Sequence, residues 1–262
     1  MRKNTLKEIW ARGEAVINGW CSIPSSFSAE IMAHQGFDSI TIDTQHGLVE
    51  YQTAVTMLQA ISTTPVIPLI RVPWNEPGRL MKMLDAGAYG VICPMINTPE
   101  DAEALVGACK YPPRGYRSFG PIRAKYYGGG SSHGGGDYHQ FADEETLVIP
   151  QIETREAIKN LDAILEVPGI GAIYIGPSDL SMALGKEPRK GQSDPEVVDA
   201  RRHILATAKR HGIPAGIHTN STAVSVAMIK EGFQFVSIQS DDRFLMAKAK
   251  EEVAAVREGI KP

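Results

Sequence analysis

The sequence predicts an α/β fold, a (β/α)8 TIM barrel. Eight short apolar segments follow one another along the 262 residues, and each leads into a segment with helical spacing. The apolar segments are continuous rather than alternating, which is typical of strands buried on both faces of a parallel sheet. The length fits one barrel, and no Gly-x-Gly-x-x-Gly motif of a Rossmann domain follows the first strand. We therefore expect a single domain over residues 1–262.

The strands are apolar runs bounded by turn residues. They are expected at residues 15–23, 39–43, 66–71, 90–95, 147–153, 172–177, 213–218 and 235–239. Helices are indicated by apolar spacing and end signals: Thr98-Pro99-Glu100 combines a cap, a first-turn proline and an acid, and Gly36 and Gly232 are candidate helix ends. They are expected at residues 3–12, 26–36, 50–62, 77–87, 98–110, 154 onward, 195–211, 221–232 and 241–258.

Residues 111–140 interrupt this pattern. The stretch is rich in Gly, Pro, Ser, Arg and Tyr and contains the glycine-rich segment 128–136. An irregular stretch of this length inside a compact domain is usually functional or mobile. Its glycines follow no strand and open no clear helix, which disfavours a phosphate-binding loop. The loops after the seventh and eighth strands also lack the glycines of the usual barrel phosphate site, which disfavours a phosphorylated substrate. We expect a mobile lid or a disordered loop.

Composition disfavours several function classes. The net charge is −3 and no block of Lys and Arg stands out, which disfavours a nucleic-acid or membrane-surface partner. No apolar run approaches the roughly 20 residues that span a bilayer, and the charged N-terminus lacks a signal core. The three cysteines form no CxxC pair, so a reducing, cytoplasmic location is expected.

Polar residues gather at the predicted strand ends. In a barrel these positions face one common mouth, whatever their separation in sequence. They are Asp43, His46, Arg71, Gln151, Glu153, Ser178, Asp179 and His218. Acids, bases and a cation converging on one mouth predict an active site.

Two of these residues, Glu153 and Asp179, suit a divalent metal. Carboxylate oxygens favour a hard cation such as Mg²⁺, or Mn²⁺ or Co²⁺. The alternative is that either acid only caps the helix that follows it. Two acids at neighbouring strand ends, with Arg71 opposite, favour the metal.

Arg71 and His46 are candidate catalytic residues. Arg71 could simply pair with a carboxylate, or it could stabilise negative charge on a reacting oxygen. His46 follows Asp43 in the same loop, so we expect a general base rather than a structural histidine. Asp85 precedes the fourth strand, at the opposite end of the barrel, and is either a surface acid or needs a neighbouring subunit to act.

Five motifs together resemble one known family, the HpcH/HpaI metal-dependent pyruvate aldolases. The resemblance covers roughly residues 15–245, and its motifs occur in the family's order. They are residues 36–46 (Gly-Phe-Asp-Ser-Ile-Thr-Ile-Asp-Thr-Gln-His), 71–77 (Arg-Val-Pro-Trp-Asn-Glu-Pro), 111–117 (Tyr-Pro-Pro-Arg-Gly-Tyr-Arg), 151–156 (Gln-Ile-Glu-Thr-Arg-Glu) and 176–181 (Gly-Pro-Ser-Asp-Leu-Ser).

The resemblance implies a role for each site residue. Glu153 and Asp179 would bind the metal, and Gln151 with the Ser178–Asp179 backbone would hold the oxo acid. Arg71 would stabilise the enolate oxygen. His46 would be the base, acting through water, with Asp85 of an adjacent subunit raising its basicity. The implied assembly is a hexamer whose last helix is exchanged between subunits.

The implied reaction is reversible aldol cleavage of a 4-hydroxy-2-oxo acid through a metal-stabilised enolate. Its products are an aldehyde and pyruvate or a close 2-oxo acid, and the implied context is aromatic or sugar-acid catabolism. Gln45 departs from the glutamate that many members carry, which leaves substrate preference open, including the aldehyde and pyruvate versus hydroxypyruvate. Two alternatives remain. A Schiff-base aldolase needs a strand-end lysine, whereas Lys82, Lys110, Lys159 and Lys230 lie in helices or loops. The barrel could also bind an oxo acid without catalysis.

Overall fold

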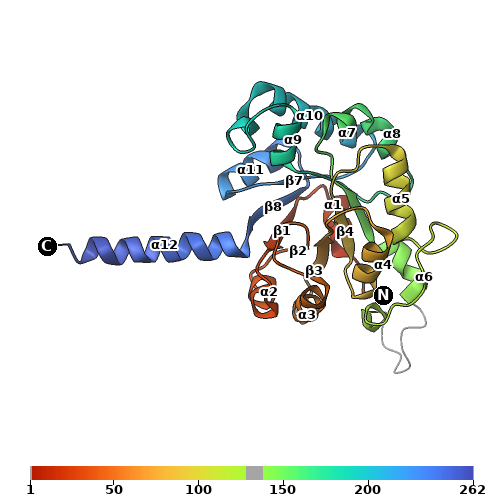
Figure 1. Cartoon of the computed structure of the whole chain (residues 1–262), viewed down its shortest axis with the longest axis horizontal. Helices are drawn as coiled ribbons and strands as arrows, with labels where there is room; N and C mark the ends of the chain where they lie inside the picture. The colour runs from red at the N-terminus through yellow and green to blue at the C-terminus, as the bar shows by residue number, and fades with distance from the viewer. Residues whose placement is uncertain (1, 128–137, 262) are drawn as a thin grey trace.

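The protein forms an eight-stranded parallel barrel with surrounding helices, as a computed structural model shows for residues 2–127 and 138–261 (Figure 1). The strand order is β5-β4-β3-β2-β1-β8-β7-β6, and every ladder is parallel. The strands are β1 (Val16–Cys21), β2 (Ser39–Asp43), β3 (Ile67–Arg71), β4 (Gly90–Cys93), β5 (Leu147–Pro150), β6 (Ile173–Ile175), β7 (Ala215–His218) and β8 (Phe235–Ser240). The predicted TIM-barrel fold is confirmed.

Helices surround the sheet and also precede its first strand. They are α1 (Thr5–Ala11), α2 (Ser26–Ala33), α3 (Tyr51–Ile61), α4 (Pro77–Asp85), α5 (Pro99–Cys109), α6 (Tyr138–Glu145), α7 (Arg155–Lys159), α8 (Leu161–Leu165), α9 (Pro177–Ala183), α10 (Pro195–Arg210), α11 (Thr222–Glu231) and α12 (Asp241–Gly259). Two short 3-10 helices, η1 (Ala124–Tyr127) and η2 (Lys190–Ser193), lie in connections. No helix within the described residues is both long and apolar enough to span a membrane.

The barrel closes between β5 and β6 through few contacts. A single isolated bridge joins Gln151 to Tyr174, and the Ile152 amide donates to the Tyr174 carbonyl at 2.9 Å. Both strands are shorter than predicted: β5 ends at Pro150, and β6 ends before Pro177 opens α9. Proline lacks the amide hydrogen that a continuing ladder needs.

Two apolar clusters stabilise the barrel. The larger one fills the space between the sheet and the outer helices. The smaller one includes interior strand residues such as Leu69, Ile149 and Phe235, and residues Leu6 and Trp10 of α1 pack into it. Helix α1 therefore packs against the barrel core, and the polar strand-end residues are left to form the opposite mouth.

Three helical features differ from the sequence prediction. Helix α6 begins at Tyr138, inside the stretch expected to be irregular, and continues to Glu145, with Tyr138 and Ala142 packed against Tyr111. The helix expected from residue 154 is broken at Asn160, whose side-chain amide donates to the Asn97 carbonyl at 2.8 Å. Helix α9 was not predicted. The glycine-rich segment 128–136 lies outside the described residues.

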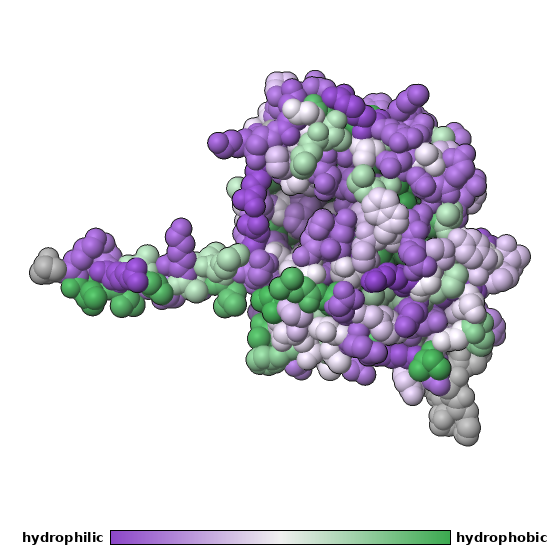
Figure 2. Space-filling view, viewed as in Figure 1, coloured by the Kyte–Doolittle hydropathy of each residue, from purple (hydrophilic) through white to green (hydrophobic). Residues whose placement is uncertain are grey.

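Helix α12 extends away from the barrel (Figure 1). Its first residue, Asp241, is buried and anchors it: the carboxylate accepts from the Ser22 amide at 2.8 Å and from the Ser28 hydroxyl at 2.7 Å. The rest of the helix is largely exposed, including Leu245, Val253 and Val256. Figure 2 shows hydrophobic side chains along one side of this projecting helix.

Candidate active site

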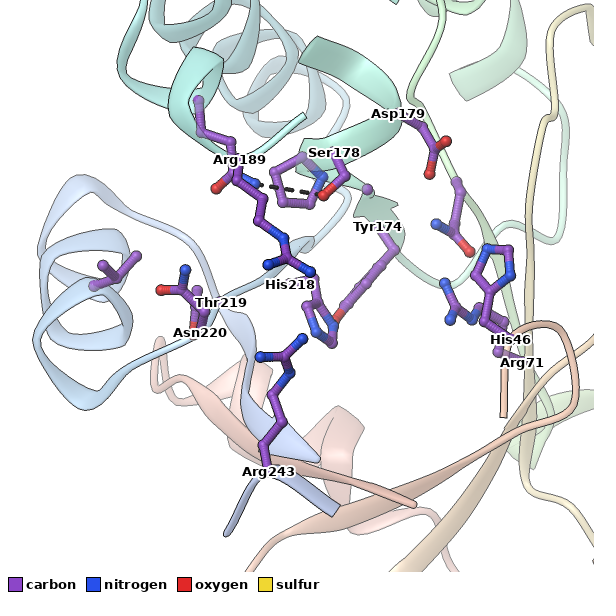
Figure 3. A pocket seen from close by; sticks show the side chains of 15 residues that line it. His46, Arg71, Tyr174, Ser178, Asp179, Arg189, His218, Thr219, Asn220 and Arg243 are labelled. Carbon is purple, nitrogen blue, oxygen red and sulfur yellow. Dashed lines mark hydrogen bonds between the residues drawn. The ribbon is translucent and has the colours of Figure 1, made fainter. Parts of the chain in front are cut away.

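A cavity of about 500 Å³ opens at the carboxyl ends of the strands (Figure 3). This is the size of a small-molecule site, at the end of the barrel where such sites form. Its lining comprises His46, Arg71, Gln151, Tyr174, Gly176, Pro177, Ser178, Asp179, Arg189, Gln192, His218, Thr219, Asn220, Val224 and Arg243. Six of the eight predicted strand-end residues are in this lining, namely His46, Arg71, Gln151, Ser178, Asp179 and His218, and Glu153 lies directly behind it against Gln151.

Glu153 is held in a buried cradle just beyond the end of β5. The side chain is 2% exposed, and its two oxygens accept from the Met95 amide at 3.0 Å and from the Gln151 side chain at 2.9 Å. Burial raises the pKa of Glu153 to about 7, and nearby Asp179 adds to the rise, although the Met95 bond opposes it. The side-chain oxygen of Gln151 is buried without a hydrogen-bond partner.

Asp179 lies in the first turn of α9 and is exposed. Gly176 is the N-cap residue of this helix, with no side-chain capping bond, and Pro177 follows it. Asp179 therefore does not cap the helix, and Thr154 rather than Glu153 caps α7 through the Ala157 amide at 3.0 Å. Neither carboxylate has the capping role that was the alternative to metal binding.

Arg71 and Asp43 form a bidentate salt bridge between neighbouring strands. They are partners in the β2–β3 register, and Arg71 donates from Nε to Oδ1 at 2.9 Å and from Nη2 to Oδ2 at 2.6 Å. The guanidinium also lies 4.8 Å from the ring centroid of Trp20, whose indole donates to Asp43 at 3.2 Å. Burial alone would raise the pKa of Asp43, but the bonds to Arg71 and Trp20 outweigh it and lower that pKa.

His46 reaches the cavity from a tight loop after β2. Asp43 accepts from the backbone amides of Gln45 at 3.0 Å and His46 at 3.2 Å. A side chain at Gly47 would collide with the Asp43 carbonyl, 2.2 Å away. Asp43 therefore fixes the loop that carries His46 by bonding to its backbone, while the imidazole is exposed at the cavity.

Asp85 is not among the residues that line this cavity. It ends α4, and its carboxylate accepts from Arg117 at 2.6 Å. Arg117 is 1% exposed and lies over the ring of Tyr111, with its Nε and Nη1 lacking hydrogen-bond partners. Within one chain, Asp85 and His46 are thus in separate places, as the sequence position of Asp85 indicated.

The cavity also contains residues that the sequence analysis did not single out. Tyr174 points inward from β6, stacks on Trp20 at 5.9 Å, and its hydroxyl lies 3.3 Å from His218 Nδ1. The alternation of β6 side chains was the signal that could have identified it. Arg189 comes from the segment after α9 and Arg243 from the start of α12. Arg189 follows no strand directly, and Arg243, three residues after the end of β8, falls inside the helix expected from residue 241, so the strand-end positions included neither arginine.

Comparison with known proteins identifies the relatives of this chain. The chain is 38% identical to the hydroxypyruvate/pyruvate aldolase of Rhizorhabdus wittichii, over 97% of this chain and 99% of that protein. It is 35% identical to a 4-hydroxy-2-oxo-heptane-1,7-dioate aldolase of Escherichia coli, covering 97% and 94%. A solved structure of an HpcH/HpaI aldolase/citrate lyase family protein from Burkholderia cenocepacia matches with a TM-score of 0.90 at 30% identity, covering 97% and 100%.

The family model described as HpcH/HpaI aldolase/citrate lyase matches residues 20–247. This match confirms the resemblance drawn from the five sequence motifs. The chain therefore belongs to the HpcH/HpaI aldolase/citrate lyase family.

Proposed function

We propose that this protein reversibly cleaves a 4-hydroxy-2-oxo acid to pyruvate, or a close 2-oxo acid, and an aldehyde. The observation that carries the proposal is the grouping of Glu153, Asp179 and Gln151 with Arg71 at one cavity. Relatives over almost the whole chain are named as aldolases of this substrate type. Lyase activity of this kind needs a group that stabilises an enolate and a base that moves a proton, and the cavity holds candidates for both.

The residues present fit a divalent cation held by Glu153 and Asp179. The donors are all oxygens, Glu153 is buried with a raised pKa, and the unpartnered Gln151 oxygen lies in the same place. A hard cation such as Mg²⁺, Mn²⁺ or Co²⁺ would offset this buried negative charge. No cluster of three or more His, Cys, Asp or Glu side chains occurs among residues 2–127 and 138–261, so the remaining positions would go to water and substrate. When bound, such a cation supplies Lewis-acid chemistry.

The chain's own residues account for the remaining steps. Gln151 and the backbone of Ser178 and Asp179 position the oxo acid in the cavity. His46 accepts the proton of the 4-hydroxyl group, directly or through a water molecule. The C3–C4 bond then breaks to release the aldehyde, and Arg71 stabilises the negative oxygen of the enolate that remains. Protonation at C3 gives pyruvate.

Arg71 is suited to this role because its orientation is fixed before substrate arrives. The two bonds to Asp43 and the stacking on Trp20 hold the guanidinium at the cavity wall. A preorganised charge costs no reorientation during the reaction. In this proposal, Asp85 of a second copy of the chain acts on His46, and Arg117 holds its carboxylate in place.

The proposed assembly is a homo-oligomer, a hexamer in which α12 packs on a neighbouring copy. Leu245, Val253, Val256 and Ile260 are exposed and fall on one face of the helix. A second copy would bury this face. The proposed cytoplasmic location is supported by the three cysteines, all of which are buried free thiols.

A Schiff-base aldolase is disfavoured by the position of the lysines. No lysine lines the cavity in the described part of the chain. Lys110 is the lysine whose burial lowers its pKa to about 8, but its Nζ donates to the carbonyls of Asp143 and Thr146, away from the cavity. Trapping of a pyruvate adduct by borohydride would reverse this judgement.

The test is a panel of 4-hydroxy-2-oxo acids assayed for pyruvate release before and after chelation. We expect EDTA to abolish cleavage and Mg²⁺, Mn²⁺ or Co²⁺ to restore it. Undiminished cleavage after chelation would contradict the metal site. Failure to cleave any panel member with metal present would instead favour an oxo-acid-binding protein without catalytic activity.

A further inference from the structure

The two sides of the cavity differ in charge. Figure 3 shows His46, Arg71 and Asp179 on one side and Arg189 and Arg243 on the other, with Tyr174 and His218 between them. The first side holds the proposed metal ligand Asp179 and the proposed catalytic residues, and Ser178, whose hydroxyl accepts from Gln192 at 3.5 Å, borders the second side. The second side has no role in the chemistry proposed above.

The second side carries the positive charges of Arg189 and Arg243. Arg71 is fully paired with Asp43, as two hydrogen bonds show. Neither Arg189 nor Arg243 has an ion pair among the described residues. Asp179 is the one carboxylate among the lining residues that the structure describes, and it lies on the opposite side of the cavity.

The two arginines come from separate segments but converge on one place. Arg189 descends from the segment after α9, and Arg243 rises from the first turn of α12. Their guanidinium groups approach His218 from either side (Figure 3). The nearby lining residues Gln192, Thr219 and Asn220 are polar and uncharged, so they add hydrogen-bonding groups without cancelling the positive charge.

We propose that Arg189 and Arg243 bind a carboxylate at the far end of the acceptor aldehyde, so that this enzyme prefers aldehydes carrying a second acid group. The inference rests on the proposed aldolase function and deepens it. Guanidinium groups bind carboxylates with paired, charge-assisted hydrogen bonds. A cavity of about 500 Å³ has room for an acceptor beyond the pyruvate half. The arginines would then determine specificity while the metal side performs the chemistry.

The test compares two acceptors of the same size in the aldol addition to pyruvate. Succinic semialdehyde carries a carboxylate, and 4-oxobutanamide replaces it with a neutral amide. We expect the unmodified protein to favour succinic semialdehyde in kcat/KM. In Arg189→Gln/Arg243→Gln the ratio of the two kcat/KM values should fall about 10- to 100-fold, the range for loss of charge-assisted bonds.

Two exposed positions outside the cavity lining provide the matched control. The double variant Lys190→Gln/Arg257→Gln also removes two positive charges. Lys190 is the residue after Arg189, and Arg257 lies further along α12 than Arg243. This control should leave the acceptor ratio unchanged, and thermal unfolding should show that both double variants fold. An unaltered ratio in the Arg189→Gln/Arg243→Gln protein would overturn the proposal.

Two further measurements separate the possible failures. Deuterium exchange of the pyruvate methyl group, followed by NMR without any aldehyde, reports the metal side alone. If the pyruvate methyl group exchanges but the acceptor ratio of Arg189→Gln/Arg243→Gln is unaltered, only the arginine site is rejected. If the methyl group does not exchange, both the proposed function and this inference are rejected. A second pair of acceptors, glyceraldehyde 3-phosphate and glyceraldehyde, measures the preference for a phosphate. If the kcat/KM ratio of this pair exceeds the kcat/KM ratio of succinic semialdehyde to 4-oxobutanamide, the arginines bind a phosphate and the carboxylate assignment is overturned.

Discussion

The Glu153 carboxylate fills the space beside the α-carbon of Gly176. A methyl group at position 176 would lie 2.0 Å from Glu153 Oε2 and 3.1 Å from the Gln151 side-chain nitrogen. These are the residues proposed to hold the metal and the oxo acid. The absence of a side chain at Gly176 is therefore what allows a buried carboxylate between the ends of β5 and β6.

Gly176→Ala should displace Glu153 and weaken the proposed metal site. We expect metal affinity to fall at least about tenfold, as for other disturbances around metal ligands, and stability to fall by about 1–3 kcal/mol from overpacking. Calorimetric titration with Mn²⁺ measures the first and thermal unfolding the second. Gly120→Ala is the control, because nothing lies within 4 Å of its added methyl. Unaltered Mn²⁺ affinity in Gly176→Ala would place the metal elsewhere.

Asp179→Ala should abolish metal-dependent turnover while the barrel remains folded. The side chain is exposed and makes no capping bond, so its loss should cost little stability. Turnover should fall by more than about 100-fold, beyond the loss seen when only a supporting residue is removed. Steady-state kinetics with saturating metal checks this, with Asp199→Ala as an exposed acid of α10 for comparison. Full turnover in Asp179→Ala would exclude it as a ligand.

Arg71→Lys should lower kcat although the positive charge is kept. A lysine cannot reproduce the two parallel bonds to Asp43 or the stacking on Trp20. A misplaced charge should cost about 100-fold in kcat, the scale of losing one preorganised stabilising group. Arg155→Lys, at an exposed ion pair with Glu196, is the control. A change confined to KM would instead indicate a role in substrate binding only.

His218 should make the protein less stable as the pH falls below about 6.5. Burial, with the charges of Arg71 and Arg243, lowers the pKa of His218 from 6.5 to about 4. The unfolded chain therefore takes up a proton at pH 5 that the folded chain does not, so unfolding is favoured as the pH falls from 6.5 through about 4. Because His218 also faces the cavity, we expect a loss of about 1–2 kcal/mol between pH 7.5 and pH 5.

Urea unfolding at those two pH values, at fixed protein concentration, measures this effect. His218→Asn should retain more of its stability at pH 5 than the unmodified protein does. His34→Asn changes an exposed histidine at the end of α2 and serves as the control. Equal pH dependence in the unmodified protein and His218→Asn would show that this imidazole is not the responsible group.

Val256→Glu on α12 should dissociate the proposed oligomer. Val256 is exposed and shares a helix face with Leu245, Val253 and Ile260. A buried, unpaired carboxylate in that interface would cost several kcal/mol. Light scattering measures the mass, and Ala247→Glu on the opposite helix face is the control. A monomeric unmodified protein would contradict the assembly itself.

The strands and the strand-end residues could be predicted because both depend on local pattern. Continuous apolar runs identified all eight strands, and the barrel rule then brought Gln151 and Asp179 together at one mouth. Even the Arg71–Asp43 pair follows from this rule, since both end neighbouring strands in the same register. What the sequence lacked was the contact of Asp43 with the His46 backbone, which depends on the shape of one loop.

The remaining parts of the site depend on tertiary placement. Arg189 and Arg243 lie in a connection and a helix start, where no periodic pattern marks a position as facing the cavity. Helix α6 was hidden by a surrounding sequence rich in glycine and proline, and its buried residues Tyr138 and Ala142 are defined by contacts with a distant Tyr111. Such residues can be assigned to the site or to the core only from the folded structure.

The proposed ligands lie on opposite sides of the weakest join in the barrel. Glu153 follows β5 and Asp179 follows β6, and these two strands form no continuous ladder, being joined by the isolated bridge from Gln151 to Tyr174 and by single backbone hydrogen bonds. A cation bound by both carboxylates would cross-link the ends of β5 and β6, where the barrel lacks a continuous ladder. Loading the site would then stiffen the whole circumference of the sheet, and hydrogen exchange at the amides of Gln151 and Ile152 would slow along with it.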